Sequence, residues 1–297
     1  MRYAALVSGL LAACASAPAP NCRCLGSRPG MSLEEAQAIV TEFEANHLRL
    51  DPNSPLHDPH SLADVLEILK SDELDLFPAG VAFASKQEGP IAKALTAQIE
   101  LAWGEAELTL AETFSLIAAT RERTLRDAEP AGTATHDARA RIDTDRAVAE
   151  ALTRLAAEHS ATGGRQAREV IQAAPADYQG YRVAADYYRM RERWNEFDAT
   201  LARIAELNPD SNGLVFLRGV SALDREGDGP KADRYFRQAL EKDPKFVRAQ
   251  VYLLRSQRGL AAKYAEYRKL KALNPHHQLV VWTGPALERE NAERSSL

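Results

Sequence analysis

The chain has 297 residues, of which 45% are hydrophobic and 27% are charged, and its formal net charge is −5. These values are ordinary for a soluble globular protein and allow a sizeable core in one large or two modest domains. No run of 18 or more apolar residues occurs, which excludes a transmembrane helix, and the acidic balance argues against a nucleic-acid partner. Alanine and leucine are abundant while runs of β-branched and aromatic residues are few, so we expect an all-α fold.

Residues 1–13 are predicted to be an export signal. Arg2 supplies a positive charge and residues 4–13 form an apolar stretch, the two features of a secretory signal peptide. The motif LAAC, which ends at Cys14, resembles the lipobox of bacterial lipoproteins. That resemblance implies cleavage before Cys14 and a diacylglycerol on its thiol. The alternative is ordinary cleavage after an Ala-x-Ala site near Ala15 or Ala17, which would give a soluble secreted or periplasmic protein.

Residues 14–30 are rich in proline and glycine, which predicts a flexible tether. Alanine and serine, rather than aspartate, follow the cysteine of the lipobox, and in two-membrane bacteria this resembles the outer-membrane default. The remaining cysteines, Cys22 and Cys24, are too close in sequence for an unstrained disulfide with each other. They can be reduced, bridge to another chain or bind a metal, and two plain cysteines in a tether are the simplest alternative.

Residues 31–135 are predicted to form a helical cap domain. The segment SLEEAQAIVTEFEANHL begins with Ser32 and carries Glu35 three residues later, which matches a capping box, and SLADVLEILK predicts a second, shorter helix. A long helix is expected over residues 90–129, where apolar residues recur every three or four positions, and Gly104 is a candidate break or bend in it. The polar stretch PAGTATHD then predicts a loop. Such a domain would cover the apolar end of a repeat array.

The second half of the chain contains an internal repeat. Four segments end alike, as VIQAAPAD, IAELNPDS, ALEKDPKF and LKALNPHH. Their prolines stand 34, 35 and 31 residues apart, at Pro175, Pro209, Pro244 and Pro275. A period near 34 indicates an array of two-helix units, in which each proline ends the second helix. The unit that ends at Pro175 is the least regular of the four.

The best unit, residues 213–244, resembles the tetratricopeptide repeat. Small, aromatic, small and proline residues stand where that family has them, at Ala232, Phe236, Ala239 and Pro244. The stretch GDGP within the unit predicts the turn between its two helices. The preceding unit departs from the family, since Phe197 and Ile204 stand where small residues are expected. The resemblance implies a solenoid of three to four hairpins over residues 144–282, followed by a tail, 283–297. Helical hairpins of another kind are the alternative and would leave the fold class unchanged.

Charge is divided unevenly along the chain. Residues 31–164 hold 11 basic and 24 acidic residues, whereas residues 165–275 hold 21 basic and 15 acidic residues. Arginines stand seven residues apart, close to two helical turns, on the expected first helices of successive units. They are Arg182 and Arg189, Arg218 and Arg225, and Arg248 and Arg255, with Arg258 one turn further on. In the tetratricopeptide family the first helices line the concave groove, so the resemblance implies that these arginines form a basic groove.

Arginine side chains bind carboxylates through two parallel hydrogen bonds, so we expect this groove to hold an acidic or C-terminal peptide of a protein partner. Two alternatives stay open. The arginines can be solvated or pair with Asp186, Asp224 and Asp228, or the acidic cap can itself lie across the groove. Together with Cys14, the groove predicts a membrane-tethered scaffold of the cell envelope. An accessory subunit of an envelope transport or assembly system, and an enzyme built on the cap, are the alternative functions.

Familiar catalytic motifs are missing from the sequence. It contains no Gly-rich phosphate loop, no His-Glu-x-x-His and no Gly-x-Ser-x-Gly. Glu105 stands beside Trp103, but a glutamate on an amphipathic helix usually faces water. We therefore predict that the chain is not an enzyme and carries no cofactor.

Histidines and aspartates gather in NHLRLDPNSPLHDPHSL, where they could form a zinc or calcium site. They lie on a segment broken by prolines and match no metalloprotease spacing, so solvated loop side chains are the simpler interpretation. A second pair follows the last repeat proline and is a weaker candidate. The residues concerned are His47, Asp51, His57, Asp58, His60, His276 and His277. No metal site is predicted.

Overall fold

The computed structural model describes residues 31–47, 51, 53–128 and 136–295. Within these ranges the chain forms twelve α-helices and two short 3₁₀ helices and no β-strand, so the all-α prediction is confirmed. The predicted signal peptide, the tether and Cys14 lie outside the described residues.

Short helices precede the long ones. They are α2 (Leu33–His47), η2 (Pro55–His57), α3 (Leu62–Ser71), η3 (Leu74–Leu76) and α4 (Phe77–Ala84). The predicted capping box is present at the start of α2, because the Ser32 amide donates to Glu35 at 2.8 Å and the Glu35 amide donates to Ser32 Oγ at 3.1 Å. Ser61 and Asp64 form a second capping box at the start of α3. Local polar residues thus define where both helices begin.

The longest helices, α5 (Pro90–Ala128) and α6 (His136–Ala173), pack against each other as a hairpin. Gly104 is a candidate break or bend from the sequence, and the break is wrong, since α5 runs through this residue without interruption. A Cβ atom at Gly104 would lie 2.9 Å from the Ala156 carbonyl oxygen, so the glycine lets α6 approach closely. Residue 144 lies inside α6. The unit ending at Pro175 is therefore one long helix paired with α5 and not a short hairpin of its own.

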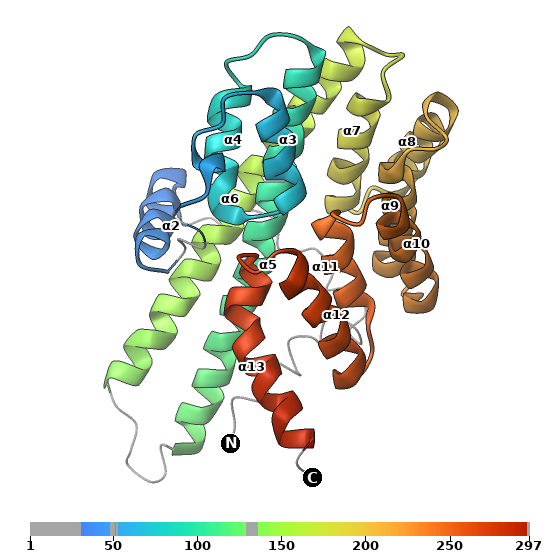
Figure 1. Cartoon of the computed structure of the whole chain (residues 1–297). Helices are drawn as coiled ribbons and strands as arrows, with labels where there is room; N and C mark the ends of the chain where they lie inside the picture. The colour runs from blue at the N-terminus through green and yellow to red at the C-terminus, as the bar shows by residue number, and fades with distance from the viewer. Residues whose placement is uncertain (1–30, 48–50, 52, 129–135, 296–297) are drawn as a thin grey trace.

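Three short hairpins follow, and a last helix closes the described chain. The hairpins are α7 (Tyr178–Met190) with α8 (Trp194–Leu207), α9 (Asn212–Asp224) with α10 (Gly229–Lys242), and α11 (Val247–Ser256) with α12 (Leu260–Leu273); the last helix is α13 (Gln278–Ser295). Each connection within a hairpin is three or four residues long, which requires antiparallel neighbours. Figure 1 shows the hairpins one beside the next, with α7 of the first hairpin against the α5–α6 pair.

Packing in the α9–α10 hairpin follows the expected register. Ala232, Phe236 and Ala239 are all fully buried. The predicted turn is present, with Gly227 at φ +66°, a conformation that favours glycine. Phe197 and Ile204 are also fully buried, although they replace small residues. In the α7–α8 hairpin, large side chains therefore fill the space between the helices, where small residues would have let the helices pack more closely.

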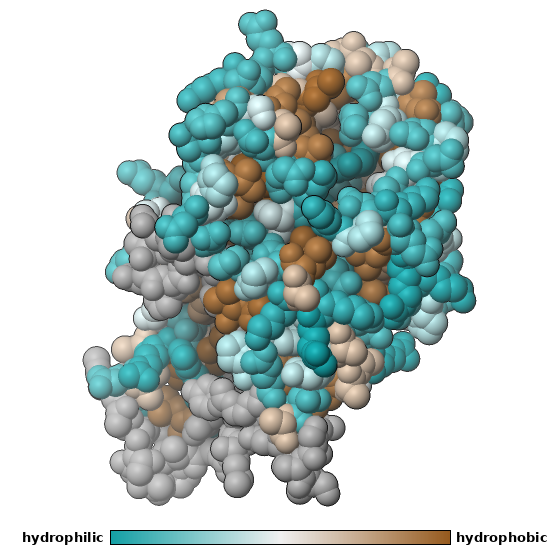
Figure 2. All heavy atoms as spheres, in the orientation of Figure 1, coloured by the Kyte–Doolittle hydropathy of each residue, from teal (hydrophilic) through white to brown (hydrophobic). Residues whose placement is uncertain are grey.

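Helix α5 lies between two sets of elements. On one side it shares an apolar core with α2, α3, α4 and α6, and on the other it packs against α7 (Figure 1). The α12–α13 turn contacts the end of α3, where Asn274 Nδ2 donates to the Ser71 carbonyl at 2.9 Å and to Glu73 Oε1 at 3.0 Å. The inner side of the hairpins is thus covered by α5 and α3. On the face in Figure 2, apolar side chains form separate patches among hydrophilic ones.

Candidate functional site

The candidate site lies where α5 meets α7 and α11, which are the first helices of the first and the third short hairpins. Ala97 and Leu101 on α5 pack with Val183, Ala184 and Met190 on α7 in one buried cluster. This apolar contact brings the neighbouring polar side of α5 over the arginines of α7 and α11.

A single carboxylate, that of Glu105 on α5, is bound by groups from both helices. Arg189 Nη2 of α7 donates to Glu105 Oε2 at 2.8 Å. Arg248 Nη2 and Tyr252 Oη of α11 also donate to this carboxylate, and Arg255 Nη1 lies 4.0 Å from Oε1. We call Glu105, Arg189, Arg248, Tyr252 and Arg255 the carboxylate cluster. It joins three helices that are distant in the sequence.

Burial makes these interactions strong. The side chain of Glu105 is 16% exposed, and those of Arg189 and Arg248 are 8% and 13% exposed. Burial alone raises the pKa of Glu105, but the charges of Arg189 and Arg248 and the hydrogen bond from Tyr252 outweigh it and hold the pKa well below 4.5. Burial also raises the pKa of the Tyr252 phenol, which stays a proton donor. The carboxylate is therefore ionised and accepts hydrogen bonds from three side chains.

Two further carboxylates surround the arginines. Arg189 Nη1 lies 3.4 Å from Asp224 Oδ2 and its Nε lies 3.9 Å from Asp186 Oδ1, while Arg248 Nη2 lies 3.7 Å from the same Asp186 oxygen. Asp186 and Asp224 are thus partners of the arginines, as one alternative predicted. Asp228 is not, because it caps α10 by accepting from the Lys231 amide at 2.9 Å.

Three of the predicted groove arginines lie away from the carboxylate cluster. Arg218 and Arg258 are exposed. Arg225 Nη1 donates to Asp198 of α8 at 2.7 Å, and its guanidinium stacks over the Trp194 ring. Helix α9 is the middle one of its row and buries apolar residues on most of its circumference, which leaves only its outer side for arginines. The arginines spaced seven residues apart therefore lie on the side of the hairpins that meets α5 in α7 and α11, whereas those of α9 do not.

Arg182, the remaining predicted groove residue, lines a small cavity of about 40 Å³. Asp186 and Arg248 line the same cavity, together with Gln98 of α5. The structure therefore brings Arg182, Arg189, Arg248 and Arg255 together on one side of α5. Whether they bind a partner stays a prediction.

The residue that the sequence interpretation missed is Glu105. The expectation that it faces water is wrong, because α5 is covered on two sides and the glutamate lies on the side that meets α7 and α11. The sequence contains a related spacing, although this spacing alone does not distinguish a buried face from a solvated one. Gln98, Glu105 and Glu112 stand seven residues apart on α5, the same spacing as Arg182 and Arg189 on α7.

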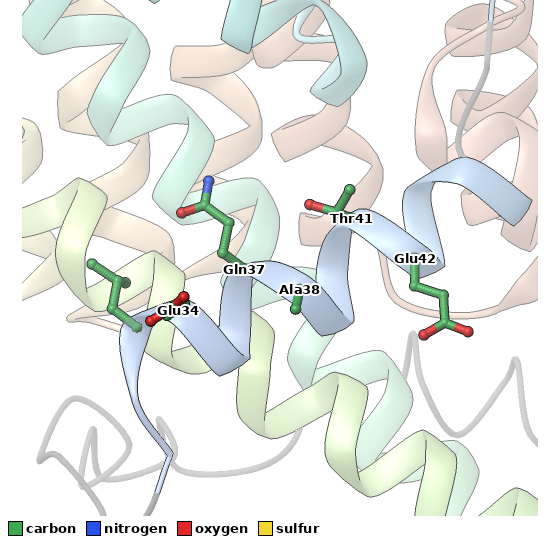
Figure 3. A pocket seen from close by; sticks show the side chains of 6 residues that line it. Glu34, Gln37, Ala38, Thr41 and Glu42 are labelled. Carbon is green, nitrogen blue, oxygen red and sulfur yellow. The ribbon is translucent and has the colours of Figure 1, made fainter.

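A larger depression, of about 690 Å³, lies along the exposed side of α2. Figure 3 shows the residues that line it, and all of those described belong to this one helix. Glu34, Gln37, Thr41 and Glu42 are exposed there. One helix face with separated carboxylates does not form a site with a defined chemistry.

A second polar cluster lies between α5 and α6. His159 Nδ1 lies 2.6 Å from Glu100 Oε2, and its Nε2 lies 3.6 Å from Glu107 Oε1. The Trp103 ring stacks on the imidazole with centroids 4.0 Å apart. Neither cavity described above borders this cluster. Its partners lie on the two helices of one hairpin, so it fastens α5 to α6.

The histidines of the proline-broken segment do not assemble into a metal site. His57 Nε2 lies 2.9 Å from the Asp51 carbonyl oxygen and 3.7 Å from Asp75, and His60 is exposed beside Asp58. His277 is buried and lies 3.5 Å from Asp72. Within the part of the chain that the structure describes, no group of three or more His, Cys, Asp or Glu side chains could hold a metal ion.

No protein-family model matches the chain, and no curated protein matches it. Among the helices of the described residues, none combines the length and the apolar character needed to cross a bilayer.

Proposed function

We propose that the chain is a scaffold that binds a protein partner in the cell envelope through a tetratricopeptide-like array of helical hairpins. The period near 34, the short paired helices and the buried Ala232, Phe236 and Ala239 support the array. In this proposal α5, together with the short helices before it, is the cap that lies across the inner side of the array.

The observation that carries the proposal is the convergence of Arg189, Arg248 and Tyr252 on one carboxylate. The inner side of the hairpins has the chemistry to select an ionised carboxylate, and Glu105 acts as an internal ligand for it. An acidic segment of a partner would engage the same row of arginines. Arg255 is the member through which a partner gains access, because 31% of its side chain is exposed and the exposed Arg258 follows it.

Attachment to the membrane is the second part of the proposal. The lipobox-like motif ending at Cys14 would anchor the protein by a lipid, and residues 15–30 would carry the array away from the bilayer. A protein held in this way meets partners in the envelope, which agrees with a binding surface and the absence of catalytic motifs in the sequence.

The test measures the affinity of the full mature chain for a short polyglutamate peptide by fluorescence anisotropy, with a polyglutamine peptide for comparison. Arg255→Glu should weaken binding at least about tenfold, because charge reversal replaces attraction with repulsion. The matched control is Arg234→Glu on α10, an exposed arginine on the second helix of a hairpin. Binding should also weaken as salt rises.

Equal affinity for both peptides, or an equal effect of the two variants, would contradict the proposal. Deleting the cap is a poor test, because α5 covers the apolar side of α6 and its removal would expose that core. Glu105→Ala is the better variant. It frees Arg189 and Arg248 and should raise the affinity for polyglutamate.

A further inference from the structure

The cavity beside Arg182 lies where five helices meet. Leu69 of α3, Gln98 of α5, Arg182 and Asp186 of α7, and Arg248 at the start of α11 all line it. Phe216 and Leu217 of α9 and Phe246 complete its wall. The volume of about 40 Å³ is room for a few water molecules, or for one carboxylate group with a short alkyl end.

Two residues that line this cavity carry hydrogen-bond donors that have no partner among the described residues. Gln98 is 5% exposed and its side-chain nitrogen Nε2 is buried without a hydrogen bond. Arg182 is half-buried and forms no hydrogen bond or ion pair with any described residue. A buried donor without an acceptor costs about 1–3 kcal/mol, which applies to the Gln98 amide, and Arg182 beside it is a cation without a bound anion.

The charge of the lining has the matching sign. Two guanidinium groups, of Arg182 and Arg248, face one carboxylate, that of Asp186. Arg248 is already bound to Glu105, whereas Arg182 has only the through-space attraction of Asp186 and Tyr178, and burial lowers its pKa in spite of that attraction. A carboxylate in the cavity would give Arg182 an acceptor, whereas Arg248 is already neutralised by Glu105.

We propose that this cavity binds a carboxylate group carried on a short apolar stem. Arg182 would donate to the carboxylate as a fork, the Gln98 amide would donate from α5, and Phe216, Leu217 and Phe246 would contact the stem. The group can come from a free monocarboxylic acid of the size of acetate or propionate, or from the C-terminus of a peptide. The site does not rest on the proposed scaffold function, because a free acid is sufficient to fill it.

The test is isothermal titration calorimetry of the full mature chain with acetate and propionate at constant ionic strength. Acetamide, which has the same shape without the charge, is the comparison ligand. A peptide with a free C-terminus and its amidated form make up the second arm. Saturable binding of the acids alone assigns a free acid, and binding of the free-ended peptide but not its amide assigns a chain end.

Arg182→Gln should weaken binding at least about tenfold, and the matched control Arg218→Gln, which changes an exposed arginine of α9, should not. Gln98→Leu should weaken it several-fold and gives a second variant if Arg182→Gln melts early. An anomalous peak between Arg182 and Gln98 in crystals soaked with bromoacetate would place the ligand directly. The proposal is overturned if no acid and no peptide binds, if acetamide binds as well as acetate, or if Arg218→Gln has the same effect as Arg182→Gln.

Discussion

Arg189 Nη2 of α7 donates to Glu105 Oε2 of α5 at 2.8 Å, across 84 residues of chain. The same carboxylate accepts from Tyr252 of α11, 147 residues away from it. One side chain therefore links the cap to the first and the third of the short hairpins, and its removal is expected to affect all three elements together.

Glu105→Gln should lower the free energy of unfolding by about 3–5 kcal/mol, because it leaves Arg189 and Arg248 buried without their main counter-charge. Urea denaturation followed by circular dichroism measures this. Glu150→Gln, at an exposed position of α6, is the matched control and should stay within about 0.5 kcal/mol of the wild type. Equal stability of the two variants would mean that the carboxylate cluster contributes nothing to the fold.

Stability should fall as the solution becomes acidic. The folded-state pKa of Glu105 is depressed by Arg189, Arg248 and Tyr252 against the opposing effect of burial. Its contribution is therefore present above the ordinary value of 4.5 and is lost as the pH falls towards the folded-state pKa. Denaturation midpoints measured between pH 3 and 7 should decline on acidification in the wild type and decline less in Glu105→Gln.

Glu73 provides a control of opposite sign for this pH series. Burial raises its pKa more than the hydrogen bond from Asn274 lowers it. Its contribution is present below 4.5 and is lost as the pH rises through the folded-state value. Glu73→Gln should therefore steepen the acid decline relative to the wild type. The same pH profile in both variants would show that the slope comes from other groups.

Ala232→Leu should destabilise the protein by about 1–3 kcal/mol, because Ala232 is fully buried on α10 and the added atoms overpack the hairpin. The control is Gln238→Leu, which adds leucine at an exposed position of the same helix. Thermal melting compares the two. A melting temperature of Ala232→Leu within error of the wild type would show that the assigned repeat register is wrong.

Gly163→Ala should also destabilise, although alanine is the better helix former by about 1 kcal/mol. A Cβ atom there would lie 2.9 Å from the Ala97 carbonyl oxygen and 2.7 Å from Leu101, so α5 and α6 would have to move apart. Thr162→Ala, at the preceding and less buried residue, is the comparison. A rise in melting temperature for Gly163→Ala would contradict the close contact.

Cys14→Ser should abolish the incorporation of a radioactive fatty acid and either release the protein from the membrane or leave its signal uncleaved. Cys22→Ser, in the predicted tether, should leave labelling intact. This prediction comes from the sequence, since Cys14 lies outside the described residues. Unchanged labelling of Cys14→Ser would rule out the lipid anchor.

Local chemistry allowed much of the secondary structure to be predicted from the sequence. Ser32 and Glu35 satisfy each other's amides within four residues, and the glycine-rich turn before α10 needs only its own backbone freedom. The spacing of Ala232, Phe236 and Ala239 likewise depends on one helix and its immediate neighbour. Such features depend on contacts between residues within about one repeat, so the local sequence is sufficient to predict them.

The path of α5 was decided by tertiary structure alone. Gln98, Glu105 and Glu112 on α5 are spaced seven residues apart, as on an ordinary solvated helix face. No feature of the neighbouring sequence distinguishes a carboxylate that faces water from one that faces arginines. That choice depends on where α5 crosses α7 and α11, which is determined by apolar contacts such as those of Leu101 with Val183. The sequence therefore determined an all-α chain of paired helices with arginines in register. Only the packing of α5 over α7 and α11 decided which arginines meet a carboxylate, because burial on both sides of one helix is a property of its neighbours.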